Sequence, residues 1–133
     1  MKEPIWIRKD FVLSLHEVLL AEFGGSAGIR DEGLLESALG RPQNLFCYGT
    51  PSLFDLAASY AHGIVSNHPF VDGNKRSGFM AAYTFLGRNG FQLQASEPDA
   101  TAATLALASG DLMEQEYAQW LKQNSKRTKK PGQ

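Results

Sequence analysis

The chain has 133 residues, of which 43% are hydrophobic, and this suits one globular domain with a single core. No apolar run is long enough to span a bilayer and no secretory leader is visible, so we expect a cytoplasmic protein without a membrane partner. The net charge is −1, but four basic residues lie in the last eight positions, so the rest of the chain has nine basic and fourteen acidic residues. That excess of acidic residues argues against direct nucleic-acid binding.

Apolar residues recur with a period near 3.6, which is typical of helices. We expect the first helix to begin at an N-cap, Asp10, and to end at Gly24 and Gly25. His16 falls among the polar positions of this helix, and we expect it to be exposed to solvent. Asp31 then caps a short second helix that runs to about residue 39.

The stretch 41–54 is predicted to be an irregular loop or a short hairpin, because Gly40 and Pro42 end the second helix. The stretch contains a second proline and three aromatic residues. Cys47, the single cysteine, lies within it; it excludes an internal disulfide, has no ligand cluster around it, and is interpreted as a half-buried filler.

Two helices in the middle of the chain are predicted to flank a short loop. The first is capped by Asp55 and stops near Asn67, and the second covers 74–88. The second is apolar nearly all round, which places it at the centre of a bundle. Ser96 and Asp111 open two further helices. Strand signal is limited to 4–7 and 91–94, so the fold class is all-α, an orthogonal bundle.

The end of the chain is basic and polar. We predict a single domain over residues 1–125 and a disordered, solvated tail over 126–133. An arm that touches RNA is the alternative for this tail.

The segment 68–76 reads H-P-F-V-D-G-N-K-R and carries the chemistry of the chain. Pro69 has no N–H and biases His68 away from helical angles, so the preceding helix must stop there. Gly73 then allows a flexible entry into the next helix. A helix N-terminus presents free N–H groups and the positive end of the helix dipole, which together form an anion site.

The side chains of this segment match the needs of phosphoryl or nucleotidyl transfer. Arg76 can bind phosphate oxygens bidentately, and Lys75 adds a compact charge. Asp72 could cap the helix or hold Mg²⁺ between two phosphates, and His68 could accept a proton from an attacking hydroxyl. Each residue alone has a plainer interpretation as a loop histidine, an N-cap or a solvated first turn. Their combination within nine residues favours catalysis.

These nine residues resemble the Fic/Doc signature, H-x-F-x-[D/E]-[G/A]-N-[G/K]-R, at every fixed position. The segment 28–38 and the residues 41–43 are similar to death-on-curing (Doc) proteins, a branch of this superfamily. The resemblance extends from about residue 10 to residue 122. It implies a compact all-helical domain around a central buried helix, with a short hairpin-like flap.

The resemblance also implies roles for single residues, with ATP as co-substrate and Mg²⁺ as cofactor. His68 corresponds to the catalytic base and Asp72 to the Mg²⁺ ligand. The phosphate-binding positions are Gly73, Asn74, Lys75 and Arg76. The flap between residues 41 and 54 docks the target chain by strand-like pairing. Its docking residues are Asn44, Leu45, Phe46, Cys47 and Tyr48.

Two departures from the AMP-transferring Fic pattern favour the Doc branch. Lys75 stands in place of a glycine and Phe79 in place of a second arginine, which changes the phosphate that can be held. The branch implies transfer of the ATP γ-phosphate to a protein hydroxyl, with elongation factor Tu as target and arrest of translation as result. Gly73 stands where the best-known member of the branch has alanine, which keeps AMP transfer as an alternative. A non-catalytic nucleotide-binding module is a third possibility.

The inhibitory helix of the family, [S/T]-x-x-x-E-[G/N], is absent from the sequence. Glu32-Gly33 is the only glutamate followed by glycine or asparagine, and Gly28 occupies the position that needs Ser or Thr. A toxin without its own inhibitory helix implies that another protein inhibits it in trans. The resemblance therefore predicts a type II toxin–antitoxin system with an antitoxin of the Phd type.

Overall fold

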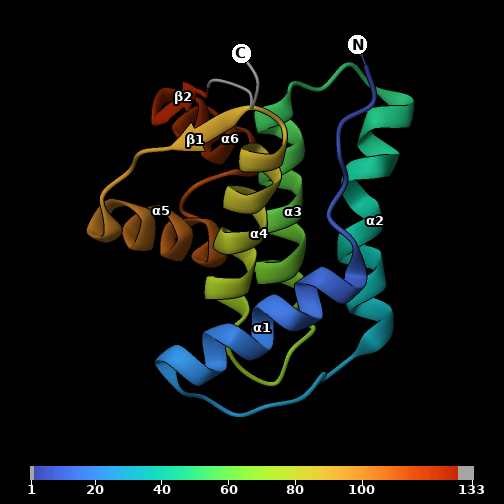
Figure 1. Ribbon diagram of the computed structural model, residues 1–133, viewed down its shortest axis with the longest axis vertical. Coiled ribbons are helices and arrows are strands. Elements are labelled where there is room, and N and C mark those ends of the chain that lie inside the picture. The colour runs from blue at the N-terminus through green and yellow to red at the C-terminus, as the bar shows by residue number, and fades with distance from the viewer. Residues whose placement is uncertain (1, 129–133) are drawn as a thin grey trace.

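The computed structural model describes residues 2–128, which form six helices and one small antiparallel sheet (Figure 1). This confirms the all-α fold class. None of the helices within that range is long and apolar enough to cross a bilayer. The helices and strands follow in the order α1 Lys9–Phe23, α2 Glu32–Tyr48, α3 Leu53–Asn67, α4 Asn74–Arg88, β1 Phe91–Leu93, α5 Glu97–Ser109, α6 Glu114–Gln123 and β2 Ser125–Arg127.

The pair α3 and α4 forms the centre of the bundle, with α2 and α6 packed against α3. Tyr60 of α3 and Phe85 of α4 are fully buried, with ring centroids 5.3 Å apart. The two backbones approach closely at Gly78, where an added Cβ would lie 2.8 Å from a methyl group of Val65 and 3.1 Å from the Ala61 carbonyl oxygen. The apolar pattern of residues 74–88 thus correctly predicted a central helix.

Several helix ends follow the local sequence signals. The Asp31 carboxylate accepts the Leu34 N–H at 2.9 Å, and the Ser96 hydroxyl accepts the Asp99 N–H at 3.2 Å, so both N-caps are confirmed. Gly24 closes α1 with a positive φ of 84°.

Other helices begin at residues that we did not expect. Ser52, not Asp55, caps α3, and the two side chains form a reciprocal capping box at 3.1 and 2.8 Å. Asp10 lies inside the first turn of α1, after the N-cap Arg8. The helix α6 begins at Glu114, later than expected.

The second helix is much longer than predicted. It continues to Tyr48, past Gly40 and the internal Pro42, so the expected loop or hairpin over 41–54 is wrong and only 49–52 connects α2 to α3. Pro42 removes one backbone hydrogen bond, but its ring is completely buried in the core. Packing against α3 therefore outweighs the local helix-breaking tendency.

The small sheet joins a predicted strand to the expected tail. β1 pairs antiparallel with β2, with Phe91 opposite Arg127. The Arg127 guanidinium lies 4.9 Å from the centroid of the Phe91 ring, and the Thr128 N–H donates to the Gly90 carbonyl oxygen at 2.9 Å. The prediction of disorder from residue 126 is therefore wrong for 126–128, while 129–133 lie outside the described residues. The expected strand at 4–7 is not present.

The loop between α3 and α4 lies at one end of the bundle, where α1 crosses in front of it in the view of Figure 1. The connection 24–31 between α1 and α2 runs along the same end. It pairs with the loop through an antiparallel bridge between Ile29 and Phe70. This arrangement brings α1 and the 24–31 connection next to the nine-residue motif.

Candidate active site

The motif loop has an unusual backbone at both ends. His68 caps the C-terminus of α3 in the left-handed region, with φ 50° and ψ 55°, and is the only non-glycine residue among 2–128 with positive φ. Gly73 caps the N-terminus of α4 with φ 80°. Non-glycine residues with positive φ are uncommon and concentrate at functional sites. The expected end of α3 at Asn67 and start of α4 at Asn74 are both confirmed.

Asn74 organises the loop from inside. Its side chain is buried, accepts the Phe70 N–H at 3.0 Å and donates back to the Phe70 carbonyl oxygen at 3.0 Å. These two bonds fix the orientation of the amide group, because the backbone N–H can only donate and the carbonyl only accept. Phe70 itself is 1% exposed and anchors the loop in the core.

The His68 ring is exposed next to this amide. Its Nδ1 lies 3.2 Å from Asn74 Nδ2, which can only donate, so Nδ1 accepts this bond and a neutral ring has its proton on Nε2. The His68 carbonyl oxygen accepts from Arg30 Nε at 2.6 Å, which fastens its backbone to the 24–31 connection. A substrate hydroxyl that gives its proton to this tautomer must displace Asn74 from Nδ1.

Asp72 is exposed, yet its carboxylate is held at both oxygens. Oδ1 accepts the Gly73 N–H at 2.8 Å and Oδ2 accepts the Ser26 N–H at 3.2 Å. No side chain of the described residues caps α4, so the alternative of Asp72 as the helix N-cap is excluded. The Asp72 carboxylate therefore lies at the N-terminal end of α4 without serving as its N-cap, and its oxygens can accept further contacts.

The Asp72 carboxylate could hold a magnesium ion together with phosphate oxygens of a substrate. Each carboxylate oxygen accepts one hydrogen bond and keeps further lone-pair capacity. Among residues 2–128, no group of three or more His, Cys, Asp or Glu side chains comes together to form an all-protein metal site. Mg²⁺ is commonly held by one or two carboxylates together with substrate phosphates.

The first turn of α4 combines free N–H groups with exposed cationic side chains. The first intrahelical bond runs from the Ser77 N–H to the Gly73 carbonyl oxygen, so the N–H groups of the three residues between them have no acceptor within the helix. Lys75 and Arg76 are exposed in this turn, and the Arg76 guanidinium lies 4.3 Å from the centroid of the Phe23 ring. Two cations at the positive end of a helix dipole are unfavourable without an anionic partner.

His16 was wrongly expected to be exposed to solvent. It is 4% exposed, its ring stacks on the Phe70 ring at 3.8 Å and 9°, and its Nε2 lies 2.8 Å from the Asp72 carbonyl oxygen. The sequence did contain a signal for its burial. His16 is four residues after Val12 and three before Leu19, the two other buried residues of α1.

The residues predicted to form a target-docking flap do not form a hairpin. Asn44, Leu45, Phe46, Cys47 and Tyr48 lie in the last turns of α2, where the backbone is helical and offers no strand edge. They lie at the opposite end of the bundle from the motif (Figure 1), separated from it by the length of α3, about 20 Å. Cys47 is exposed, not half-buried.

The segment that does lie beside the motif is the connection 24–31. The Val71 N–H donates to the Gly28 carbonyl oxygen at 3.0 Å, and the Arg30 N–H donates to the Pro69 carbonyl oxygen at 2.7 Å. Between these bonds, Ile29 is 38% exposed. Its contact with the motif joins segments some forty residues apart, which no local pattern indicated.

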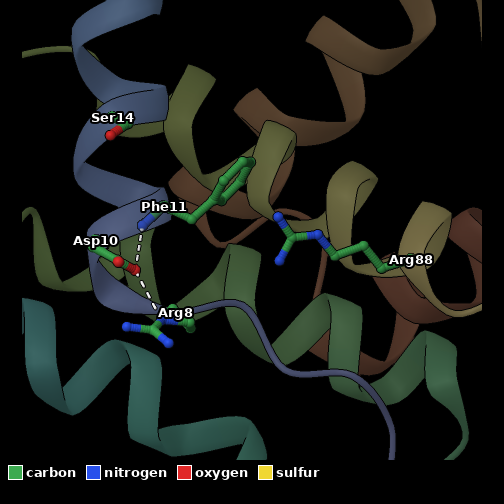
Figure 2. Close-up of a pocket in the computed structure, with 5 residues that line it drawn as sticks. All are labelled: Arg8, Asp10, Phe11, Ser14 and Arg88. Carbon is green, nitrogen blue, oxygen red and sulfur yellow. Dashed lines mark hydrogen bonds and ion pairs between the residues drawn. The ribbon is translucent and has the colours of Figure 1, made fainter.

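A surface hollow at the other end of α4 is unrelated to the motif. Figure 2 shows the side chains that line it, from the start of α1 and the end of α4. The Arg88 guanidinium lies 4.4 Å from the centroid of the Phe11 ring, and Asp10 is bound by Arg8 at 3.1 Å. The partners of these charged groups are thus found within the chain.

Comparison with known proteins agrees with the motif and the fold. The model of the Fic/DOC family matches residues 6–86. The chain is 33% identical to "Protein kinase doc" of Escherichia phage P1 over 107 residues, 80% of this chain and 84% of the relative. It is 49% identical to "Toxin Doc" of Mycolicibacterium smegmatis (strain ATCC 700084 / mc(2)155) over 76 residues, 55% of this chain and 58% of that relative. The chain therefore belongs to the Fic/DOC family, within its Doc branch.

Proposed function

We propose that this protein is a Doc-type toxin that transfers the γ-phosphate of ATP to a hydroxyl group of a protein target. The observation that carries the proposal is the convergence of His68, the Asp72 carboxylate and the uncapped N-terminus of α4 on one six-residue loop. Phosphoryl transfer needs a base, a metal-binding carboxylate and an anion site, and little covalent chemistry from the protein.

In the proposed mechanism, His68 accepts the proton of the attacking hydroxyl at Nδ1 as the new P–O bond forms and the bond to the leaving ADP breaks. The Asp72 carboxylate would hold Mg²⁺, which neutralises phosphate charge when bound. The N–H groups of the first turn of α4, with Lys75 and Arg76, bind the phosphate oxygens. Phe23 supports the Arg76 guanidinium through its ring face.

Phosphate transfer is favoured over AMP transfer by two residues on α4. Lys75 brings a long cationic side chain to the first turn of α4, in place of a glycine. Phe79, one turn further on, is partly buried near Tyr83, with ring centroids 6.2 Å apart. An arginine at position 79 would supply a second clamp on a triphosphate, which phenylalanine cannot. The relative named as a protein kinase supports the same choice.

We further propose that the target chain docks at the 24–31 connection and not at the end of α2. Ile29 pairs with Phe70 on one side, and in an antiparallel bridge the alternate backbone groups point to the other side. That free edge lies directly beside the motif and suits pairing with an extended segment. The target is elongation factor Tu, and phosphorylation of one threonine would block translation.

An antitoxin of the Phd type, acting in trans in a type II toxin–antitoxin system, is part of this proposal. The support is the sequence, which contains no inhibitory-helix pattern, and the relatives, one of which is named as a toxin. The protein would act in the cytoplasm, where ATP, Mg²⁺ and elongation factor Tu are found together.

The test is transfer of label from ATP to purified elongation factor Tu in the presence of Mg²⁺. ATP labelled at the γ-phosphate should label the target, ATP labelled at the α-phosphate should not, and His68→Ala should abolish labelling while retaining the fold by circular dichroism. Label from the α-phosphate would establish AMP transfer instead. Toxicity that persists in His68→Ala cells would indicate a binding module without catalysis.

A further inference from the structure

The Asp72 carboxylate is held by a part of the chain that the family motif does not include. The N–H of Ser26, in the turn after α1, donates to Asp72 Oδ2 at 3.2 Å, and His16 of α1 contacts the Asp72 carbonyl oxygen at 2.8 Å. Both contacts join residues about fifty positions apart, so the motif alone does not determine where this carboxylate points.

Gly25 is the residue that allows the turn to come so close. A Cβ at this position would lie 2.9 Å from Asp72 Oδ2, 3.3 Å from Asp72 Cγ and 3.0 Å from a methyl group of Leu20. A real Cβ does not come within 3.0 Å of such atoms, so the carboxylate would have to move. Gly24 also has a positive φ, of 84°, but a Cβ there would meet nothing within 4 Å.

We propose that Gly25 and His16 are positioning residues that set the direction of the Asp72 carboxylate and thereby the affinity of the site for Mg²⁺ bound to ATP. His16 fixes the backbone of Asp72 by its hydrogen bond and by stacking on Phe70. Gly25 lets the Ser26 N–H reach Oδ2, so the carboxylate is held before any ligand arrives. The inference rests on the proposed function, in which Asp72 holds Mg²⁺.

The pair Gly25→Ala and Gly24→Ala gives a matched test, because both substitutions strain a backbone with positive φ and only the first meets Asp72. ATP affinity would be measured by titration calorimetry with Mg²⁺ and with EDTA. Mg²⁺ should increase the ATP affinity of the wild-type protein, and we expect this increase to be about tenfold or more smaller in Gly25→Ala. Gly24→Ala should keep that enhancement, and ATP binding in EDTA should be unchanged in both variants.

A second measurement requires neither metal nor nucleotide. Hydrogen exchange of the Ser26 amide, followed by NMR in the metal-free protein, should be faster in Gly25→Ala than in Gly24→Ala, since the displaced carboxylate no longer accepts this N–H. For His16, the variant His16→Phe keeps a ring for stacking and loses the hydrogen bond. It should lower the Mg²⁺ enhancement while melting close to the wild-type temperature.

The outcomes separate this inference from the proposed function. If Asp72→Asn loses the Mg²⁺ enhancement but Gly25→Ala behaves like Gly24→Ala in both measurements, the positioning role is refuted and the proposed function stands. If Asp72→Asn keeps the full enhancement, the Mg²⁺ role of Asp72 is itself refuted, together with the positioning that depends on it.

Discussion

Replacing Asn74 by alanine should destabilise the protein far more than the same change at Asn89, at the other end of α4. Each side chain makes two hydrogen bonds to the backbone of a single residue and a third bond to another residue. Asn74 bonds the N–H and carbonyl of Phe70, and Asn89 bonds those of Ile5 at 2.8 and 3.0 Å. The difference lies in solvent access, because Phe70 is 1% exposed and Ile5 is 58% exposed.

The magnitude follows from what is left behind. Asn74→Ala leaves a buried N–H and a buried C=O of Phe70 without partners. Each such group costs about 1–3 kcal/mol, so the loss should be about 2–6 kcal/mol. Water can replace the lost bonds at Ile5, so Asn89→Ala should cost about 1 kcal/mol.

The assay is urea unfolding followed by circular dichroism, with the free energy of unfolding taken from the midpoint and the slope. If both variants lose the same free energy, or if Asn74→Ala loses less than about 1 kcal/mol, the idea that burial makes the Asn74 bonds costly to remove is wrong. The second result would also weaken the argument that Asn74 holds the motif loop in place.

Other substitutions test the packing and the titration of the core. Gly78→Ala should destabilise the protein by about 1–3 kcal/mol in urea unfolding, because the new Cβ is overpacked against α3. Gly87→Ala should stabilise it by about 0.5–1 kcal/mol, because nothing lies within 4 Å of the new Cβ. Equal effects of the two substitutions would contradict the close approach of α3 and α4 at Gly78. Burial raises the pKa of Tyr117 to about 12. The phenol of the unfolded chain has a pKa of about 10. The stabilisation of the folded protein by the neutral Tyr117 phenol is therefore complete below about pH 10 and is lost as the pH rises toward about 12. Between pH 9 and pH 11, the urea midpoint should therefore fall less in Tyr117→Phe than in the wild-type protein. An equal fall in both proteins would count against a buried neutral phenol. Asp31→Ala should cost about 1 kcal/mol in thermal unfolding through the lost cap of α2, and an unchanged melting temperature would show that the cap is dispensable.

The parts of the structure that sequence reasoning predicted correctly are specified locally. Pro69 forces α3 to stop, and Gly73 supplies the left-handed residue before α4, so the bounds of the motif loop follow from single residues. The N-caps Asp31 and Ser96 are likewise recognised from their own side chains.

The parts that were missed depend on tertiary packing. Pro42 reads as the end of a helix, but α2 continues because its apolar face is buried against α3. Strand pairing between β1 and β2 orders a basic segment that looks disordered in isolation.

In the candidate site, the motif residues could be predicted from the sequence, but the residues that hold them in place could not. The pattern indicated His68 and Asp72, but the contacts of Asp72 with Gly25 and Ser26 come from a turn about fifty residues away. One part of this support had a local signal, since His16 lies on the buried face of α1. The contacts of the Gly25–Ser26 turn with Asp72 produce no periodic pattern in a single sequence, so they could not be predicted from it.

Phosphate transfer by the His68 loop can be tested by mass spectrometry of elongation factor Tu. The target would be incubated with the protein, Mg²⁺ and ATP, digested, and compared with a reaction containing His68→Ala. We expect one threonine-containing peptide that is heavier by a phosphate group in the wild-type reaction, and no such peptide with the variant. A peptide that carries AMP would instead establish AMP transfer, and a phosphate that appears equally with His68→Ala would show that His68 is not the catalytic base.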